Sequence, residues 1–406
     1  MNGLIHILCF LLLSEIILGQ DSAIFKNELE IKMNFEQASN HLSNEFVGAI
    51  YRGDYLDDDL KYRTYNRIQN NNRWGVDANA GMRYIFKPDS LFKKENKDKF
   101  LIEYNQIAHA HANYSKDAFA FLFFGNDIFG KQNFNFNGLN VQALNYSKFS
   151  LGYITQTDSV KASYEIKFSY LAGHHYFNLF APKAYINNND YPFSQAYDLN
   201  YEATFTNSQK FISGSGMSLD FVISNNINFF GKDLNLKVSV MDLGFINFKN
   251  NAQSLSVDTN FVWEGLPGDS LINLIQSQDI SFVDSVKKSF WPLTNTGFNA
   301  RIPTTLNTII NIPLNKGSFS FVLQYKITAA YKPLLVFCYS IPLNNFLNIE
   351  SGLRIGGYNR ASAVLNITTS INNKISFKLG TQQMIGLVLP KRTSGLSVFS
   401  TLTYSF

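Results

Sequence analysis

Residues 161–171 read KASYEIKFSYL, and apolar and polar side chains alternate through the whole stretch. One face of the expected strand carries Ala162, Tyr164, Ile166, Phe168 and Tyr170. The opposite face carries Lys161, Ser163, Glu165, Lys167 and Ser169. Such alternation is typical of a β-strand that has an apolar medium on one side and water on the other.

The same alternation recurs along most of the chain. It is clear at 74–86, 197–205, 318–328 and 347–355. One such strand could belong to any half-buried antiparallel sheet, but a whole chain of them leaves few architectures. No apolar run of helix length follows Gly19, so a membrane span would have to be built of strands. The sequence therefore predicts an all-β protein with a single transmembrane antiparallel β-barrel.

The composition agrees with a barrel and excludes one class of function. Hydrophobic residues make up 45% of the 406 residues, and aromatic residues reach 15%, with 37 Phe and 21 Tyr. Aromatic side chains at strand ends form the girdles of membrane barrels. The formal net charge of +4 is small, and the basic clusters that nucleic-acid binding needs are missing from the sequence. We expect one barrel domain, since a closed barrel grows by adding hairpins to one sheet, and no nucleic-acid partner.

Residues 1–19 have the pattern of a secretory signal peptide. Residues 4–13 are apolar apart from His6, and the small Gly19 precedes Gln20 at a plausible cleavage point, although the residues before the apolar run lack Lys and Arg. The alternative is a membrane anchor helix, which would need about 20 apolar residues. Cleavage would leave Cys338 as the single cysteine and rule out an intramolecular disulfide. The expected location is the cell outer membrane.

Residues 20–72 show no clear alternation and include the acidic residues Asp54, Asp57, Asp58 and Asp59. We interpret this N-terminal segment as a plug inside the barrel, with a periplasmic position as the alternative. The acidic stretch lacks the Gly and the ligand spacing of a calcium loop, which favours a solvated face over a metal site.

The barrel is predicted to span residues 73–406 with about sixteen strands, and fourteen is the alternative; an even number is expected for a bacterial barrel. The predicted strands are 73–86, 100–114, 132–143, 146–156, 160–172, 174–186, 194–206, 214–229, 233–248, 299–312, 317–330, 333–342, 346–357, 360–371, 374–387 and 393–406. Residues 118–129 predict a short helix or tucked segment. Residues 250–297 predict a long extracellular loop, with a helix-like stretch at 270–290.

The inward face of these strands carries side chains of both charges. The candidates for lumen-facing residues are Asp77, Arg83, Glu103, His109, His111, Glu165, Lys167, Glu202, Asp220 and Arg354. A charge-selective pore should show one dominant sign at its constriction. The mixture therefore favours a lumen with ion pairs around a plug.

Two pairs of histidines stand out. His109 and His111 are two residues apart on one predicted strand, so both imidazoles share a face. A metal could bridge them, but we favour two hydrated lumen histidines and expect neither a metal nor a cofactor. His174 and His175 are adjacent, which predicts that they point to opposite faces, near the membrane interface.

The chain ends in an alternating strand whose last aromatic residues are Tyr404 and Phe406. This ending resembles the signal that the barrel assembly machinery reads during biogenesis. The machinery and outer-membrane lipid are therefore expected partners.

The alternation changes phase within residues 240–245, which read VMDLGF. Up to Val240 the outward positions are even, and after it they are odd. An extra residue in one strand produces this change, so we predict a β-bulge near the rim at Met241 and Asp242. Gly244 would allow a bend or a close approach. The alternative is that Asp242 contacts a plug or a partner.

Several motifs point to one family. They are NNRWG at 71–75, NFNFNGLNVQALNYSKFSLG at 133–152, IKFSYLAG at 166–173, VMDLGFINFK at 240–249 and GGY at 356–358. These motifs resemble DUF5723, an uncharacterised outer-membrane barrel family of Bacteroidota-type bacteria that is distantly similar to the PorP/SprF and FadL-like barrels. The resemblance covers most of the chain and implies its fold and location. A link to type IX secretion or gliding rests on analogy alone.

Two functions from different classes remain open. The sequence contains no nucleophile elbow, paired cysteines, zinc helix motif, phosphate loop or dinucleotide fingerprint in the context that each needs, so we expect no enzyme. The first hypothesis is an outer-membrane anchor or subunit of an envelope assembly, with envelope proteins as partners. The alternative is a passive or gated channel for a small or apolar solute, as the resemblance to FadL-like barrels implies.

Overall fold

The computed structural model describes residues 27–88, 98–125, 130, 132–157, 162–189, 194–207, 211–229, 232–249, 252–264, 292–372 and 374–406. The signal-peptide prediction for 1–19 and the helix-like stretch at 270–290 lie outside these residues. Within them, no helix is long and apolar enough to cross a membrane.

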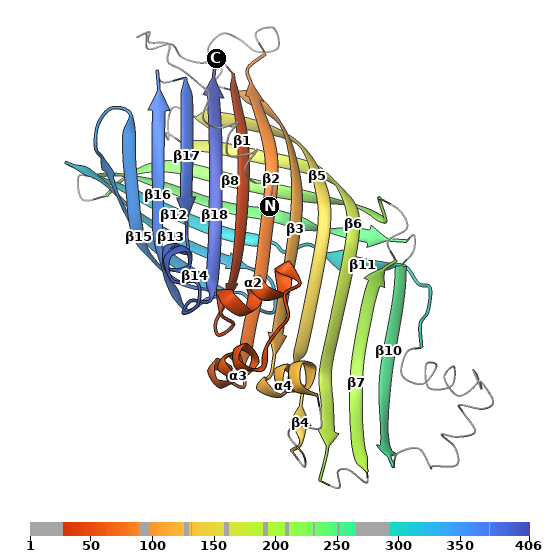
Figure 1. Cartoon of the computed structure of the whole chain (residues 1–406). Coiled ribbons are helices and arrows are strands. Elements are labelled where there is room, and N and C mark those ends of the chain that lie inside the picture. The colour runs from red at the N-terminus through yellow and green to blue at the C-terminus, as the bar shows by residue number, and fades with distance from the viewer. Residues whose placement is uncertain are drawn as a thin grey trace.

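The chain folds into a closed antiparallel barrel of fourteen strands (Figure 1). In ring order the strands are β1 (Glu28–Ser39), β2 (Asn72–Phe86), β3 (Lys99–Tyr114), β5 (Leu139–Thr157), β6 (Ala162–Asn187), β8 (Gly214–Phe229), β9 (Lys232–Phe248), β12 (Thr305–Leu314), β13 (Gly317–Lys326), β14 (Lys332–Pro342), β15 (Leu347–Gly357), β16 (Ala361–Ile371), β17 (Ile375–Thr381) and β18 (Gly395–Ser405). The ring closes because β1 pairs with β2 on one side and with β18 on the other. The prediction of a transmembrane antiparallel barrel is confirmed, with the smaller of the two strand numbers.

The first strand corrects the prediction of an N-terminal plug. Residues 28–39 form β1 in the barrel wall and lie between β2 and β18. The sequence ELEIKMNF at 28–35 alternates in the same way as the other strands, with Leu29, Ile31 and Met33 on one face. A period of two places these side chains on the outer face and their neighbours on the inner face.

The rest of the N-terminal segment forms two helices, α2 (Asn44–Arg52) and α3 (Asp58–Arg67). Ser43 caps α2, and the Asp57 carboxylate accepts a hydrogen bond from the Leu60 N–H at 2.7 Å, which caps α3. Acidic side chains in the first turn of a helix are favourable because of the helix dipole. Asp57, Asp58 and Asp59 of the acidic stretch thus begin α3, whereas Asp54 pairs with Arg52 at the end of α2.

Two pairs of predicted strands are each a single strand. The predicted strands 132–143 and 146–156 form one strand, β5, from residue 139 to residue 157. The predicted strands 160–172 and 174–186 form one strand, β6, from residue 162 to residue 187. The pairing of β6 with β5 shifts register between Asn145 and Tyr146 of β5, and β6 continues past this shift. His174 is the extra residue of this bulge, and a bulge bends a strand without ending it. These two mergers remove two of the sixteen predicted strands, and the ring keeps fourteen because β1 enters it while the predicted strand 194–206 lies outside it.

Two further strands extend the sheet beyond the ring. β7 (Gln195–Thr206) pairs with β6, and β10 (Ala252–Trp263) pairs with β7 (Figure 1). The prediction of a loop over 250–297 is therefore wrong for residues 252–263. Short strands β4 (Phe134–Asn135) and β11 (Phe298–Arg301) pair with β6 and β9.

The two ends of the barrel differ. The terminal end carries Glu28 and Ser405 and the short β12–β13 and β16–β17 connections. The helical end carries α2, α3, α4 (Lys116–Phe124) and α7 (Met384–Val388) (Figure 1). Of the segment 118–129, predicted as a short helix or tucked segment, residues 118–124 lie in α4 and residues 126–129 lie outside the described residues. In bacterial barrels short turns face the periplasm and longer loops face outward.

An aromatic rim surrounds part of the terminal end. Ring centroids lie 6.0 Å apart for Phe86 and Phe100, 5.7 Å for Phe100 and Tyr153, and 6.3 Å for Tyr84 and Phe406. From this rim toward the helical end, exposed apolar side chains cover the outer wall, among them Met82, Ile102, Phe149, Leu151, Ile166 and Phe168. A girdle and an apolar band are the features by which a barrel sits in a bilayer.

The interior is partly filled by apolar side chains from facing walls. Leu144 and Leu171 of β5 and β6 pack in one cluster with Ile246 and Phe248 of β9. All four side chains are buried. This packing joins the wall formed by β5 and β6 to the wall formed by β8 and β9 inside the barrel.

Candidate functional site

A network of ion pairs occupies the interior beside the apolar cluster. Lys167 Nζ lies 2.8 Å from Glu103 Oε2 and 3.1 Å from Asp220 Oδ2. Lys148 Nζ lies 2.8 Å from Asp220 Oδ2 and 2.6 Å from Asp242 Oδ1. The Lys148 side chain is 4% exposed and that of Asp220 is 0% exposed. Charges buried this deeply need partners, and here each lysine has at least two.

The bulge predicted at Met241 and Asp242 is present. The register between β8 and β9 shifts opposite Asp220, and Asp242 has a φ of 62°. The Asp242 N–H donates to Asp220 Oδ1 at 2.7 Å. A Cβ at Gly244 would lie 2.2 Å from the Met217 carbonyl oxygen, so the strands approach closely there. Asp242 forms an ion pair with Lys148 of the barrel wall and so belongs to the interior network of ion pairs.

A second chain of polar contacts lies toward the helical end. Asp77 Oδ2 lies 2.6 Å from Lys326 Nζ, and Asp77 Oδ1 lies 2.7 Å from His109 Nδ1. His109 Nε2 is 3.1 Å from His111 Nδ1. The two histidines are 4% and 3% exposed, so the expectation of hydrated side chains is wrong. No group of three or more metal-ligating side chains occurs in the part of the chain that the structure describes.

The other predicted lumen residues divide into two groups. Arg83 pairs with Glu165 at 2.7 Å, and Arg354 pairs with Glu36 at 2.8 Å, all from strands of the closed ring. The prediction that Glu202 faces the lumen is wrong, because its strand β7 lies outside the ring and its side chain is exposed. A period of two identifies the face of a strand, but it does not show which strands close the barrel.

Sequence reasoning missed three charged residues of the interior. Lys32 Nζ lies 2.7 Å from Glu103 Oε1, and Glu36 pairs with Arg354, but both residues lie in the segment that the sequence predicts as a plug. Lys148 alternates with outward Phe149 and Leu151, so the period of two could have placed it inward.

The turn between β15 and β16 closes the interior at the helical end. Arg73 donates hydrogen bonds to the carbonyls of Gly357, Tyr358 and Asn359 at 2.9–3.2 Å. Tyr331, from the loop after β13, packs edge-on against Tyr358 at a centroid distance of 4.9 Å. Both tyrosines are buried, so inward-folded turns cover this end of the barrel.

An apolar hollow lies on the outer wall, and we call it the helix groove. It has a volume of about 580 Å³ and lies between α2, α4 and the outer face of β2, β3, β5 and β6. Its lining residues are Leu42, Phe46, Val47, Ile50, Tyr51, Trp74, Ala112, Tyr114, Ala118, Phe119, Phe121, Leu122, Phe123, Phe136, Leu139, Val141 and Leu179. Apolar lining is the common property of sites for small apolar ligands.

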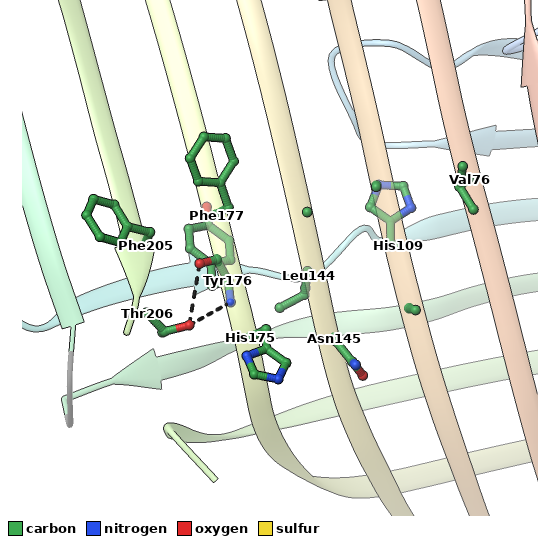
Figure 2. A pocket seen from close by; sticks show the side chains of 12 residues that line it. Val76, His109, Leu144, Asn145, His175, Tyr176, Phe177, Phe205 and Thr206 are labelled. Carbon is green, nitrogen blue, oxygen red and sulfur yellow. Dashed lines mark hydrogen bonds between the residues drawn. The ribbon is translucent and has the colours of Figure 1, made fainter. Parts of the chain in front are cut away.

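A second hollow adjoins the helix groove on the same wall, and we call it the wall pocket. Its volume is about 440 Å³. Its outward lining includes Val76, Ala108, Ala110, Ala143, Asn145, His175, Phe177 and Phe205. Figure 2 shows Asn145, His175, Phe177 and Phe205 on neighbouring strands β5, β6 and β7. The wall pocket thus combines an apolar floor with two polar side chains.

Comparison with known proteins identifies a family and several barrels. The family described as "Family of unknown function (DUF5723)" matches residues 29–381. No curated protein matches the chain. Among solved structures, a Pseudomonas aeruginosa FadL homologue is 7% identical, with a TM-score of 0.45 over 94% of this chain and 90% of that one.

Two other barrels are similar at the same level. The Pseudomonas putida toluene transporter TodX is 7% identical, with a TM-score of 0.40 over 94% of this chain and 90% of its own. The translocator domain of the autotransporter NalP from Neisseria meningitidis is 9% identical, with a TM-score of 0.35 over 95% and 90% of the two chains. Identities this low say nothing about what this chain binds.

Proposed function

Because the chain belongs to DUF5723, a family of unknown function, we propose its role from its own geometry: an outer-membrane β-barrel that takes up a small apolar solute. The solute binds first in the helix groove. The observation that carries this proposal is the groove itself, a hollow of about 580 Å³ whose lining is apolar. Burial of apolar surface contributes about 25 cal/mol per Å² to binding, before the entropic cost of association.

The outer-membrane location is supported by the outer wall of the barrel. The aromatic rim lies at the terminal end, and the apolar band follows it. With the terminal end in the periplasm, the helices face outward. The C-terminal strand, ending at Tyr404 and Phe406, is the part that we expect the barrel assembly machinery to read.

The height of the helix groove supports a role in capture. A strand crosses the hydrocarbon layer in about 9–11 residues. Counted from the rim at Phe100, this length of β3 reaches the region of Ala110. Ala112, α2 and α4 therefore lie at the outer border of the membrane, where a solute from outside arrives first.

The interior is filled in part in this conformation, although a hollow of about 390 Å³ lies on its β13–β18 side. The ion pairs of Lys148 and Lys167 and the turn that holds Tyr358 occupy it. Passage through the lumen would require these contacts to separate. The helix groove, by contrast, opens on the outer wall and is accessible without any change in the barrel.

The test uses Trp74, which lines the groove. Phenylalanine at positions 263 and 291 leaves Trp74 as the single tryptophan. A medium-chain bromoalkane should quench its fluorescence saturably in detergent and in vesicles. The Ala112→Leu variant fills the floor of the groove and should weaken binding about tenfold.

The matched control is Ala363→Leu, since Ala363 pairs with the exposed Leu353 on another part of the outer wall. This variant should bind the bromoalkane normally. Uptake of labelled alkane by whole cells should fall with Ala112→Leu and not with Ala363→Leu. If brominated phospholipid quenches Trp74 and an added alkane does not relieve this quenching, the groove is an ordinary contact with lipid and the proposal is overturned.

A non-enzymatic anchor or subunit of an envelope assembly is the second candidate. It is favoured by the interior, where charges of both signs neutralise one another without leaving one dominant sign. A mild-detergent pull-down from native outer membranes tests it. Stoichiometric envelope proteins would support this role, and a solitary barrel would count against it.

A further inference from the structure

We propose that the helix groove and the wall pocket together bind an uncharged single-chain molecule that carries one hydrogen-bond acceptor at its head, such as an ester or a ketone. The chain lies in the helix groove, and the head lies at Asn145 and His175 of the wall pocket. This inference rests on the proposed function, because it names the class of solute that the groove takes.

The two hollows form one elongated trough along the outer wall. On β3, Ala110 lines the wall pocket, and Ala112, the next outward residue, lines the helix groove. On β5 the same succession joins Ala143 to Val141. The trough runs from Asn145 past Val141 on β5, which is about 13 Å at the rise of a strand. A long, narrow site of this kind fits an extended chain.

Small side chains make the floor of the trough. Residues 107–112 read IAHAHA, so Ala108, Ala110 and Ala112 point outward while the histidines between them point inward. Elsewhere the outer wall carries large side chains such as Ile102 and Phe149. Alanines in a row between larger neighbours leave a depression in the outer wall.

The bulge in β6 brings polar side chains to the inner end of the trough. His174 lies within hydrogen-bond distance of Ser147 Oγ, 2.8 Å away, on the outer face of β5. His174 and His175 therefore both lie on the outer side, and the prediction of opposite faces is wrong. The extra residue of a bulge changes the direction of the following side chain.

These side chains form a directional chain of hydrogen bonds. Ser147 Oγ donates to Gln106 Oε1 at 2.6 Å, and Gln106 Nε2 donates to Asn145 Oδ1 at 2.6 Å. The amide oxygen of Asn145 is thereby occupied. Its Nδ2 group is a donor with no partner among the described residues, and the same holds for the exposed ring of His175.

Unpaired donors on a lipid-facing wall need an acceptor. An amide that is buried in an apolar medium without a hydrogen bond costs about 2–7 kcal/mol. Water is absent from the hydrocarbon layer, so a ligand is the remaining source of an acceptor. The Asn145 amide N–H, with the N–H of the His175 ring beside it, thus defines the head of the ligand as a hydrogen-bond acceptor.

The head is uncharged because nothing in the trough balances a charge. Among the described residues that line the two hollows, none is Lys or Arg. An ion at this depth is costly without a partner. The polar end of the trough also lies deeper in the membrane than its apolar end. A lipid in the outer leaflet has the reverse orientation, because its head would lie near α2.

The test compares three probes on the single-tryptophan protein: a medium-chain methyl ester with bromine on its terminal carbon, a bromoalkane of equal length, and the ionised bromo-acid. The ester should bind about fivefold tighter than the alkane, the effect of one hydrogen bond. The acid should bind more weakly than the ester. Because the tail lies near Trp74, terminal bromine should quench more than bromine placed beside the ester group.

Variants separate this inference from the proposed function. Asn145→Leu should remove the advantage of the ester and leave bromoalkane binding intact. Ala110→Leu should weaken the ester, and Ala363→Leu should change neither probe. Equal binding of ester and alkane to the unmodified protein, an advantage that survives Asn145→Leu, or tightest binding of the ionised acid would overturn the inference. If the alkane itself fails to bind, the proposed function fails as well.

Discussion

The ring of Tyr358 lies directly against the backbone of Gly75: a Cβ at position 75 would sit 2.3 Å from two of its ring carbons. Tyr358 belongs to the turn between β15 and β16, whereas Gly75 lies on β2. Arg73, two residues before Gly75, holds the same turn through its carbonyls. Two motifs that are far apart in the sequence, 71–75 and 356–358, thus meet at the helical end of the barrel.

Gly75→Ala should destabilise the barrel. The added methyl group has no room unless the Tyr358 ring moves, and overpacking of this kind costs about 1–3 kcal/mol. Urea unfolding in detergent micelles measures the loss. Gly48→Ala is the control, since only the flexible end of the Arg52 side chain lies within 3.4 Å of a Cβ there, and alanine is favourable in a helix.

A double-mutant cycle isolates the contact. In a Tyr358→Ala background the space beside Gly75 is free, so Gly75→Ala should cost almost nothing. Contacting residues are expected to deviate from additivity by about 0.5–3 kcal/mol. Additive losses would show that the strain at position 75 does not arise from the tyrosine.

Lys148→Met should destabilise the barrel more strongly. The substitution leaves Asp220 and Asp242 in the interior with one fewer cation, and removing one partner of a buried ion pair costs about 3–5 kcal/mol. The control is Lys183→Met near the end of β6 that pairs with β7, where the Lys183 side chain is 60% exposed and pairs with Asp198. Exposed pairs contribute about 0–1 kcal/mol. Equal losses for the two variants would contradict a structural role for the interior network.

The sequence predicted the barrel because a period of two is a local property. Residues 74–86 and 161–171 show it without knowledge of any partner strand. Residues 28–35 show it equally well, but the polar and irregular residues that follow them favour a plug over the whole segment 20–72. The prediction of two strands over the residues of β6 is wrong, because the bulge at His174 shifts the phase of the alternation within a single strand.

The candidate site was less accessible to sequence reasoning. The inward position of Glu103 follows from alternation, but its pairing with Lys167 depends on the register of three strands. The helix groove depends on where α2 and α4 dock, which no local pattern shows. The alanines at 108 and 110 were visible, but a depression exists only in contrast to large side chains on neighbouring strands.

Acid should loosen the helical end of the barrel through His41. Its Nε2 accepts from Arg360 Nη2 at 2.5 Å, and its Nδ1 lies 2.8 Å from Asn72 Oδ1. Burial lowers the pKa of His41 below 6.5, and the cations Arg360, Arg73 and Arg67 lower it further, while the bond to Asn72 opposes the shift. The folded protein therefore prefers the neutral ring, which can accept from a guanidinium.

The sign of the pH effect follows from the lowered pKa. In the unfolded chain His41 takes up a proton at higher pH than in the folded chain, so its contribution to stability is complete above about pH 6.5 and is lost as the pH falls below that value. Urea unfolding between about pH 8 and pH 5 measures the slope. His41→Gln keeps an acceptor and a donor but does not titrate, so it should flatten the profile. An unchanged slope would assign the effect to another group.

Replacing residues 43–70 with a short glycine–serine turn should leave a folded barrel that no longer binds the bromoalkane. β1 and β2 are already neighbours, and the Asn40 N–H donates to the Arg73 carbonyl at 3.2 Å, so a short connection can join them. The deletion removes α2 and α3 but keeps every strand of the ring. Because α2 packs on the outer wall and the turn between β15 and β16 covers the helical end, planar-bilayer conductance should not rise. A new current would contradict this expectation and show that the N-terminal helices obstruct the lumen. As a control, deletion of 28–39 removes β1 from the wall and should abolish folding.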